Sequence, residues 1–379
     1  MIIADKYTLE LFINGADFFA TDSARISTID IYEDIYSGLP TCTLELVFPK
    51  EAFDTNSFVD GSLITIGIIS QEFGINGKYN FRIWDIPAIV QNGNFITVQA
   101  NGVLDVYNIY HDANKYNLYA NTSDIFSKIC TENNWTSDID LTTDQQLWVA
   151  GRRNTFQFLH HMCKHGYVNE TSCMYWFFDK EKRLIYKDIS ALFKNRSTTY
   201  TFFKGTTGGD KSFAYNEIGI SLNAGTNNIN NGGYGYTYDV FDLLTYKSKE
   251  VHAKKVTAVS NVINVSKELS QGLHYDKLAM DVGNFNPNYH VAYAQNTRIR
   301  STYSTYINLS CQYLQKFRLG EIVNVDYQDI ENDDTTNKSF SMLGMIDEIH
   351  IFIAPEAIGA DVEIMTQGIN TKSEYVETF

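Results

Sequence analysis

Apolar and polar residues alternate in six successive segments of the first 104 residues, and this pattern constrains the fold more than any other feature. Asn, Gly and Asp separate the segments, as at Asn76-Gly77 and Asn92-Gly93-Asn94. A period of two is typical of strands with one buried face, and these breaks are typical of turns. Six such strands predict a first β-barrel over residues 1–104, because closure removes exposed sheet edges. The segments are Tyr7–Ile13, Arg25–Tyr32, Thr41–Phe48, Ser62–Ile69, Tyr79–Val90 and Phe95–Val103.

The pattern changes after Leu104 and predicts a small α+β domain over residues 105–195. Thr122-Ser123-Asp124 has the residue types of a helix N-cap, and an amphipathic stripe follows it. A second helix is expected from Asn154 or Thr155 to a stop at Gly166. Two strands follow, Met174–Asp179 and Arg183–Asp188.

The remaining residues predict a second barrel that inserted segments interrupt. Residues 196–265 hold its first strands, an exposed Gly/Asn-rich loop at 223–235 and an extended stretch from Val240 to Val265. Residues 266–305 are ambiguous and contain one candidate helix, Val291–Tyr303. Residues 306–379 complete the barrel and end in a short tail. The expected strands are Thr199–Phe203, Glu217–Leu222, Ile307–Tyr313, Gly320–Tyr327, Ser339–Ile353 and Asp361–Gln367.

Two regions of the chain repeat one pattern. Gly61–Ile66 matches Gly320–Val325 in character, and Phe81 or Phe340 follows each glycine by about the same spacing. We align the last strands so that Gly102 matches Gly368, with a longer turn before that strand in the second copy. Any two β-meanders could align in this way. The alternative is two related barrels in one chain, of which three copies would place six similar units in a ring. The sequence therefore favours a β-rich α+β fold with two related β-barrel domains, an inserted α+β domain and further inserted segments.

Charge and composition exclude several functional classes. The formal net charge of −15 disfavours binding to nucleic acid or to an anionic membrane, and Arg152-Arg153 is too short to act as a basic cluster. No apolar run reaches the length of a membrane helix, so no membrane anchor is expected, and no secretory signal is visible. The scattered cysteines are expected to be buried free thiols: Cys42, Cys130, Cys163, Cys173 and Cys311.

Candidate chemistry is weak. His161 and His165 stand at i,i+4 spacing beside His160 and Cys163, which is compatible with a metal, although a solvated or interface helix face explains them as well. Whether this cluster binds metal is left open. The acidic stretch Asp329, Glu331, Asp333 and Asp334 is read as a solvated hairpin tip, and residues 205–209 lack the features of a phosphate loop. We therefore expect no catalytic, cofactor-binding or metal-binding residues and no enzymatic activity.

Two blocks carry a resemblance to a known family. One block runs from Asn154–Leu159 through Gly166-Tyr167 and Tyr175–Phe178 to Arg183–Tyr186, and the other joins Phe317–Val325 to Met345–His350. With these blocks the chain resembles the hub protein of contractile-tail baseplates, the family of the T-even phage hub and of the hub part of type VI secretion spikes. The resemblance spans nearly the whole chain.

The resemblance implies a homotrimer that forms a pseudo-hexameric ring in the virion and is assembled in the host cytoplasm. Such a ring links the six-fold tail tube and other baseplate proteins to a three-fold central spike, and the genome passes through its lumen without specific binding. Few residues follow Gly368, so the spike is expected to be a separate protein. The alternatives are a tail-tip or adhesin module that recognises a host glycan, and a carbohydrate-active enzyme.

Overall fold

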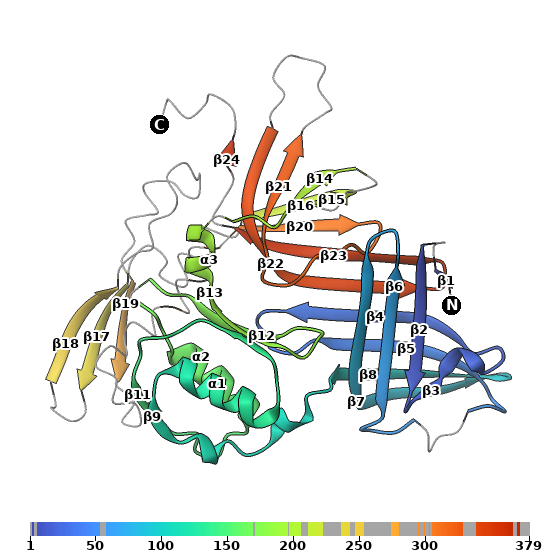
Figure 1. The fold of residues 1–379 in the computed structure, drawn as a ribbon, viewed down its shortest axis with the longest axis horizontal. Helices are drawn as coiled ribbons and strands as arrows, with labels where there is room; N and C mark the ends of the chain where they lie inside the picture. The colour runs from blue at the N-terminus through green and yellow to red at the C-terminus, as the bar shows by residue number, and fades with distance from the viewer. Residues whose placement is uncertain are drawn as a thin grey trace.

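The computed structural model gives a β-rich α+β fold, as predicted, with most helices gathered beside a large sheet (Figure 1). The described residues are 2–3, 6–53, 58–169, 171–195, 197–205, 211–222, 236–242, 247–253, 274–279, 295, 299, 303, 305–328, 339–366 and 370–371. The Gly/Asn-rich loop 223–235, the acidic stretch 329–334 and most of the candidate helix Val291–Tyr303 lie outside them.

Strands dominate both ends of the chain, and the short helices lie mainly in its middle. The strands are β1 (Ile2–Ile3), β2 (Tyr7–Ile13), β3 (Ala16–Asp17), β4 (Arg25–Asp34), β5 (Thr41–Pro49), β6 (Leu63–Ser70), β7 (Ile75–Asn92), β8 (Phe95–Leu104), β9 (Leu118–Ala120), β10 (Ser137–Ile139), β11 (Gln146–Trp148), β12 (Met174–Phe178), β13 (Leu184–Asp188), β14 (Tyr200–Lys204), β15 (Ser212–Tyr215), β16 (Glu217–Leu222), β17 (Tyr236–Asp242), β18 (Lys247–Ala253), β19 (His274–Ala279), β20 (Thr305–Cys311), β21 (Ile322–Gln328), β22 (Ser339–Ala354), β23 (Ala357–Thr366) and β24 (Asn370–Thr371). The helices are α1 (Thr122–Asn133), α2 (Thr155–His165) and α3 (Ile189–Asn195), with 3-10 turns η1 (Phe18–Ala20), η3 (Tyr107–Tyr110) and η4 (Asn114–Tyr116).

One continuous sheet contains both repeats. Eight of its strands form a path in the order β7, β8, β5, β4, β22, β23, β20, β16, and each is antiparallel to the next (Figure 1). We call this the eight-strand path. We call β4–β8 the first unit, and β16 with β20–β23 the second unit. In the described residues neither unit closes into a separate barrel, because β4 of the first unit pairs with β22 of the second. The two expected barrels are thus parts of one open sheet.

The repeat is visible in the hydrogen bonds around two turns. Gly61 and Gly320 both have left-handed φ, +85° and +79°, which glycine adopts without strain. Each N–H donates to a carbonyl on the following long strand, at 2.7 Å to Ile83 and 2.8 Å to Ile346. A bulge follows at the same place in both units, just after Ile83 in β7 and just after Ile346 in β22. The equivalence of Gly61 and Gly320 is therefore confirmed.

The remainder of the sequence alignment was wrong by four residues. Gly102 lies opposite Ile83 in the first unit, and Ile364 lies opposite Ile346 in the second, so Gly102 corresponds to Ile364 and not to Gly368. By the same register Phe81 corresponds to Gly344, not to Phe340. The longer connection of the second unit lies between β21 and β22, whereas β22–β23 has a two-residue turn like β7–β8. An even shift preserves alternation, so the pattern could not reveal it.

The same registers match the other strands in pairs. Cys42 lies opposite Gly102, and Ile307 lies opposite Ile364, so β5 corresponds to β20. Ile31 lies opposite Cys42, and Ile220 lies opposite Ile307, so β4 corresponds to β16. In the first unit a short loop connects β4 to β5. In the second unit residues 223–304 stand between β16 and β20. The inserted segments thus replace one loop of the repeat.

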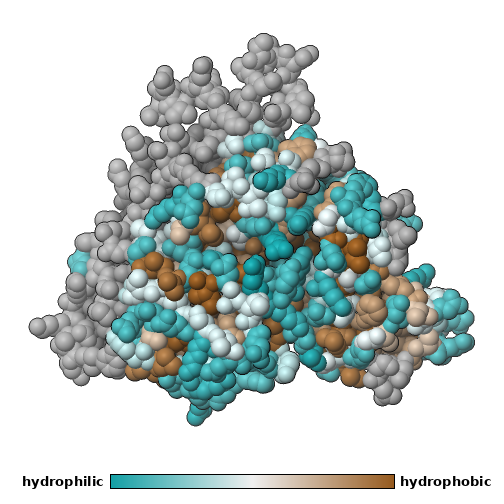
Figure 2. Space-filling view, viewed as in Figure 1, coloured by the Kyte–Doolittle hydropathy of each residue, from teal (hydrophilic) through white to brown (hydrophobic). Residues whose placement is uncertain are grey.

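The described residues form two hydrophobic cores. One is continuous through both units, and the other belongs to the α+β segment, where α1 and α2 pack with β12 and β13. On the side shown in Figure 2, hydrophilic residues run between smaller hydrophobic patches. No helix in the described part of the chain is long and apolar enough to cross a membrane.

Both predicted helices of the α+β segment are confirmed, and so are the end signals of α2. The N-cap predicted for the first helix was wrong, because Asn121 is the N-cap of α1 and the segment 122–124 forms its first turn. Asn154 and Gln157 form a capping box at the start of α2, and Gly166 is its C-cap. The start of α1 is held by buried Asp144, which accepts a hydrogen bond from the N–H of Thr122 at 3.1 Å. Gln295, from the inserted segment, is fully buried at the other end of α2.

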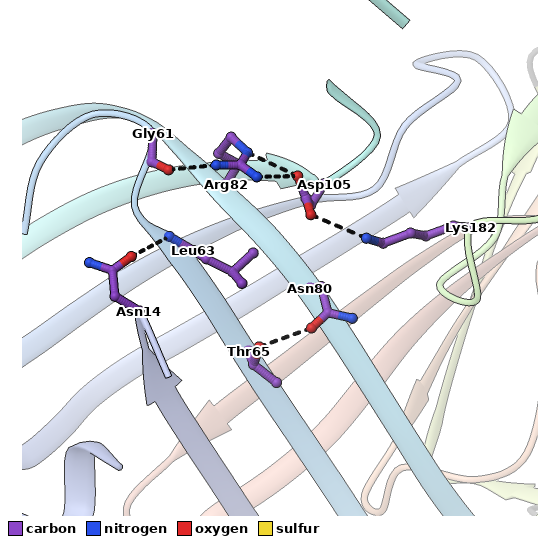
Figure 3. Close-up of polar contacts among 8 residues, drawn as sticks. All are labelled: Asn14, Gly61, Leu63, Thr65, Asn80, Arg82, Asp105 and Lys182. Atoms are coloured by element: carbon purple, nitrogen blue, oxygen red, sulfur yellow. Dashed lines mark hydrogen bonds and ion pairs between the residues drawn. The ribbon is translucent and has the colours of Figure 1, made fainter. Parts of the chain in front are cut away.

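Asp105 fixes the α+β segment to the first unit (Figure 3). Its carboxylate accepts a hydrogen bond from Nε of Arg82 on β7 at 2.9 Å and pairs with Nζ of Lys182 in the β12–β13 turn at 3.2 Å. Arg82 also donates to the carbonyl of Gly61 at 2.9 Å. The arginine thus links the repeated glycine turn to the boundary between the two parts of the chain.

Candidate functional surface

One face of the eight-strand path is polar and rich in carboxylates. Alternate residues of β4, β5, β20, β22 and β23 point into the core, and the residues between them form the opposite face. We call this the acidic face. Its carboxylates are Asp30, Asp34, Glu45, Asp85, Glu217, Glu348, Asp361 and Glu363.

His350 lies among these carboxylates where the two units meet. Its Nε2 lies 2.8 Å from Oδ1 of Asp30, and its Nδ1 lies 3.8 Å from Asp361. The imidazole ring also stacks on Tyr32, with ring centroids 4.3 Å apart. Asp30 and Tyr32 belong to β4, so these contacts join the first unit to the second across their strand pairing.

The carboxylates crowd one another. Partial burial, followed by the repulsion of Asp34, raises the pKa of Glu348. Partial burial, followed by the repulsion of Glu348, raises the pKa of Glu363. Repulsion between these carboxylates lowers the stability of the folded chain. The acidic face therefore carries a concentrated negative charge.

Two strand edges with apolar side chains lie at the ends of the eight-strand path. At one end, the residues of β7 beyond its bulge pair with β8 alone within the described residues. Trp84, Ile89 and Val90 are 59%, 48% and 55% exposed there. At the other end, β16 is paired only with β20 in the described structure, and Ile220 is 39% exposed. Sequence reasoning missed both edges, although apolar residues on both faces of Ile83–Val90 were a signal.

The histidines of α2 pack on aromatic side chains. The ring of His160 contacts Trp176 and Phe156, at centroid distances of 4.8 and 4.6 Å, and burial lowers its pKa. His161 lies against Trp148 at 5.9 Å, and His165 lies 4.4 Å from His161. Within the described ranges, no group of three or more His, Cys, Asp or Glu residues is placed to hold a metal ion.

The other residues singled out by sequence have structural surroundings. All five cysteines are free and buried. Burial raises the pKa of the Cys163 thiol to about 12, which keeps it protonated at neutral pH. Arg153 donates to the carbonyl of Ala150 at 3.2 Å. Residues 206–209 of the stretch 205–209 lie outside the described residues.

Known structures share this fold. No protein-family model matches the sequence, and no curated protein matches it. A tail protein from Neisseria meningitidis MC58 matches with a TM-score of 0.60 and 9% identity, over 95% of this chain and 96% of its own. The 43 kDa tail protein of prophage MuSo2 from Shewanella oneidensis matches with a TM-score of 0.60 and 10% identity, over 95% and 98%.

A chain of the Francisella PdpA–VgrG complex matches with a TM-score of 0.50 and 10% identity, over 96% of this chain and 58% of its own. Identities this low establish shape alone. In shape the chain agrees with the two tail proteins over nearly its whole length. The chain therefore has the fold of these tail proteins.

Proposed function

We propose that this chain is a structural, non-enzymatic hub subunit in the baseplate of a phage tail or a related contractile injection machine. The observation that carries the proposal is the fold shared with two tail proteins over 95% of the chain. In this role it acts in the virion and contacts the tail tube, other baseplate proteins and a separate central spike.

The internal repeat supports a ring. The two units follow each other head to tail in one sheet, and the contact between them is heterologous, since β4 of one unit pairs with β22 of the other. A heterologous contact that repeats with a closing rotation generates a ring. Three chains with two units each would give a pseudo-hexameric homotrimer, which suits a junction between six-fold and three-fold parts.

The acidic face supports an open channel. We place it on the inner wall of the ring, where Glu348, Asp361 and Glu363 would line the lumen. A wall of carboxylates repels DNA phosphates, so a passing genome would not be held. We also propose that the chain is organised as the sequence predicts, with domains and segments at residues 1–104, 105–195, 196–265, 266–305 and 306–379.

Light scattering of the purified full chain tests the proposal. A trimer of the 43.2 kDa chain, about 130 kDa, is the expected result, and ring-shaped particles are expected by electron microscopy. A strict monomer at high protein concentration would contradict the hub. The same preparation on a glycan array tests the adhesin alternative, where specific binding by isolated protein would favour that function instead.

A further inference from the structure

The contact between the two units within one chain is a model for contacts between chains. The part of β22 beyond its bulge pairs antiparallel with β4, with Ile351 opposite Ile31 and Phe352 opposite Asp30. The apolar side chains at this junction are buried: Ile31 is 0% exposed and Ile351 is 2% exposed. The backbone N–H of Ile35 adds a bond to the carbonyl of the bulged Asp347 at 3.1 Å.

Both strands of this junction have an equivalent at the ends of the eight-strand path. The repeat matches β22 with β7 and β4 with β16, as the bulges and registers show. Ile351 lies opposite Ala360 as Ile89 lies opposite Val98, so Ile89 is the counterpart of Ile351. The counterpart of Ile31 is Ile220. One chain therefore carries a second pair of joining strands, placed at opposite ends of its eight-strand path.

These counterparts are exposed where the originals are buried. Ile89 is 48% exposed and Ile220 is 39% exposed. Trp84, which occupies the bulge position of Asp347, is 59% exposed. An edge strand with open backbone groups and apolar side chains is a template for pairing with another chain. The edges also have the correct directions, because strict alternation along the path makes β7 of one copy antiparallel to β16 of the next.

We propose that β7 of one copy, beyond its bulge, pairs with β16 of a second copy of this chain, with Ile89 opposite Ile220 and Val90 opposite Gly219. This inference rests on the proposed ring and gives it a defined interface. The pairing repeats the β22–β4 junction between chains, so every junction around the ring is alike. With eight path strands in each chain, three chains close one continuous sheet.

Gly219 fits this register. A Cβ added there would meet only the Cβ of Asn308 on the neighbouring strand, at 3.9 Å, so the space above the glycine is open. Its counterpart in the first unit is Asp30, which lies opposite Phe352. In the proposed pairing the side chain of Val90 would cover this open space, as a large residue beside an edge glycine does.

Engineered cysteines test the register in the intact chain. Residues directly opposite each other on antiparallel strands have Cα atoms about 4.5–5.5 Å apart, within disulfide range. The Ile89→Cys/Ile220→Cys double variant should therefore form covalent dimers and trimers on mild oxidation, seen on a non-reducing gel. All native cysteines are buried, so background linkage should be low. Each single variant should remain a single chain on the gel.

The matched control is Ile89→Cys with Ser221→Cys, because residue 221 is one position away and its side chain points to the opposite face. Light scattering is measured on each variant. Covalent trimers from the Ile89→Cys/Ile220→Cys variant, and not from the control, support the proposed pairing of β7 with β16. A trimer without linkage would overturn this interface while the hub function stands, and equal linkage by both pairs would overturn the register. A monomer would contradict the hub and the interface together.

Discussion

Phe81 and Gly102 lie beside each other on neighbouring strands of the first unit, and the missing side chain of Gly102 makes the space that Phe81 uses. A Cβ on Gly102 would lie 3.1 Å from the Cβ of Phe81 and 2.8 Å from the Sγ of Cys42. The second unit exchanges the two sizes, because Gly344 replaces the phenylalanine and Ile364 replaces the glycine. Each unit thus keeps one large and one absent side chain at the same contact, which close packing requires.

Gly102→Ala is expected to destabilise the chain by about 1–3 kcal/mol, because the added methyl group overpacks a core that Phe81 and Cys42 already fill. Urea unfolding followed by tryptophan fluorescence measures the change. Gly77→Ala on the neighbouring strand β7 is the matched control, since its Cβ would meet no atom nearer than the Lys180 amine at 3.4 Å. Equal effects of the two variants would contradict the packing argument.

Gln295→Leu is expected to lower stability by about 2–4 kcal/mol, the cost of leaving buried polar groups unpaired. The amide of Gln295 donates toward the carbonyls of Cys163, Lys164 and Gly166, at 3.1, 3.0 and 2.8 Å. Its Oε1 accepts from the N–H of Met174 at 3.2 Å. Leucine has a similar size and can replace none of these bonds. Thermal unfolding measures the loss.

The exposed Gln145→Leu variant controls for the change in hydrophobicity, because the side chain at 145 lies at the surface. We expect an effect within about 0.5 kcal/mol, as is usual for surface substitutions. If Gln295→Leu behaves like this control, the inserted segment does not hold the end of α2.

Local pattern was sufficient to predict most strands and two helices of this chain. The bounds of β2, β5, α2 and β22 lie within about a residue of those expected, because alternation and capping act over short distances. The short elements β15 and α3 were missed. They offer too few residues for a period to emerge.

Contacts between distant parts of the chain could not be predicted. Asp30 and His350 meet although 320 residues separate them, and no local pattern encodes the β4–β22 pairing that brings them together. The predicted register of the repeat was wrong for a related reason, because a shift of four residues leaves the alternation of apolar and polar residues unchanged. The exposed edges follow from this topology, so Ile89 and Ile220 could be recognised only after the strands were placed.

Asp347→Asn is expected to stabilise the chain at neutral pH. Asp347 is fully buried, and no other residue in the described structure offers its carboxylate oxygens a hydrogen bond. Burial, with the nearby charge of Glu363 as a smaller cause, raises its pKa well above the ordinary value. Because the unfolded chain releases this proton at lower pH, the contribution of Asp347 to stability is full below the ordinary pKa and is lost as pH rises toward the folded pKa.

The gain from asparagine should therefore be larger at pH 8 than at pH 4, and urea unfolding at both values measures it. Asp361→Asn, whose side chain is 54% exposed on the neighbouring strand, controls for the removal of one negative charge. A gain of equal size at both pH values would show that ionisation of Asp347 has no part in it.

Ile89→Lys is expected to prevent assembly while leaving the folded chain intact. Ile89 is 48% exposed in one copy, so lysine there costs the isolated chain little. In the proposed junction the same position is buried like its counterpart Ile351, and an unpaired buried ammonium group costs several kcal/mol. Association should weaken more than tenfold by light scattering or sedimentation. Val59→Lys is the matched control, because Val59 is 47% exposed and lies off the β7 edge, so that variant should still assemble. Loss of assembly in both variants would point to general charge effects, and assembly in both would exclude Ile89 from the interface.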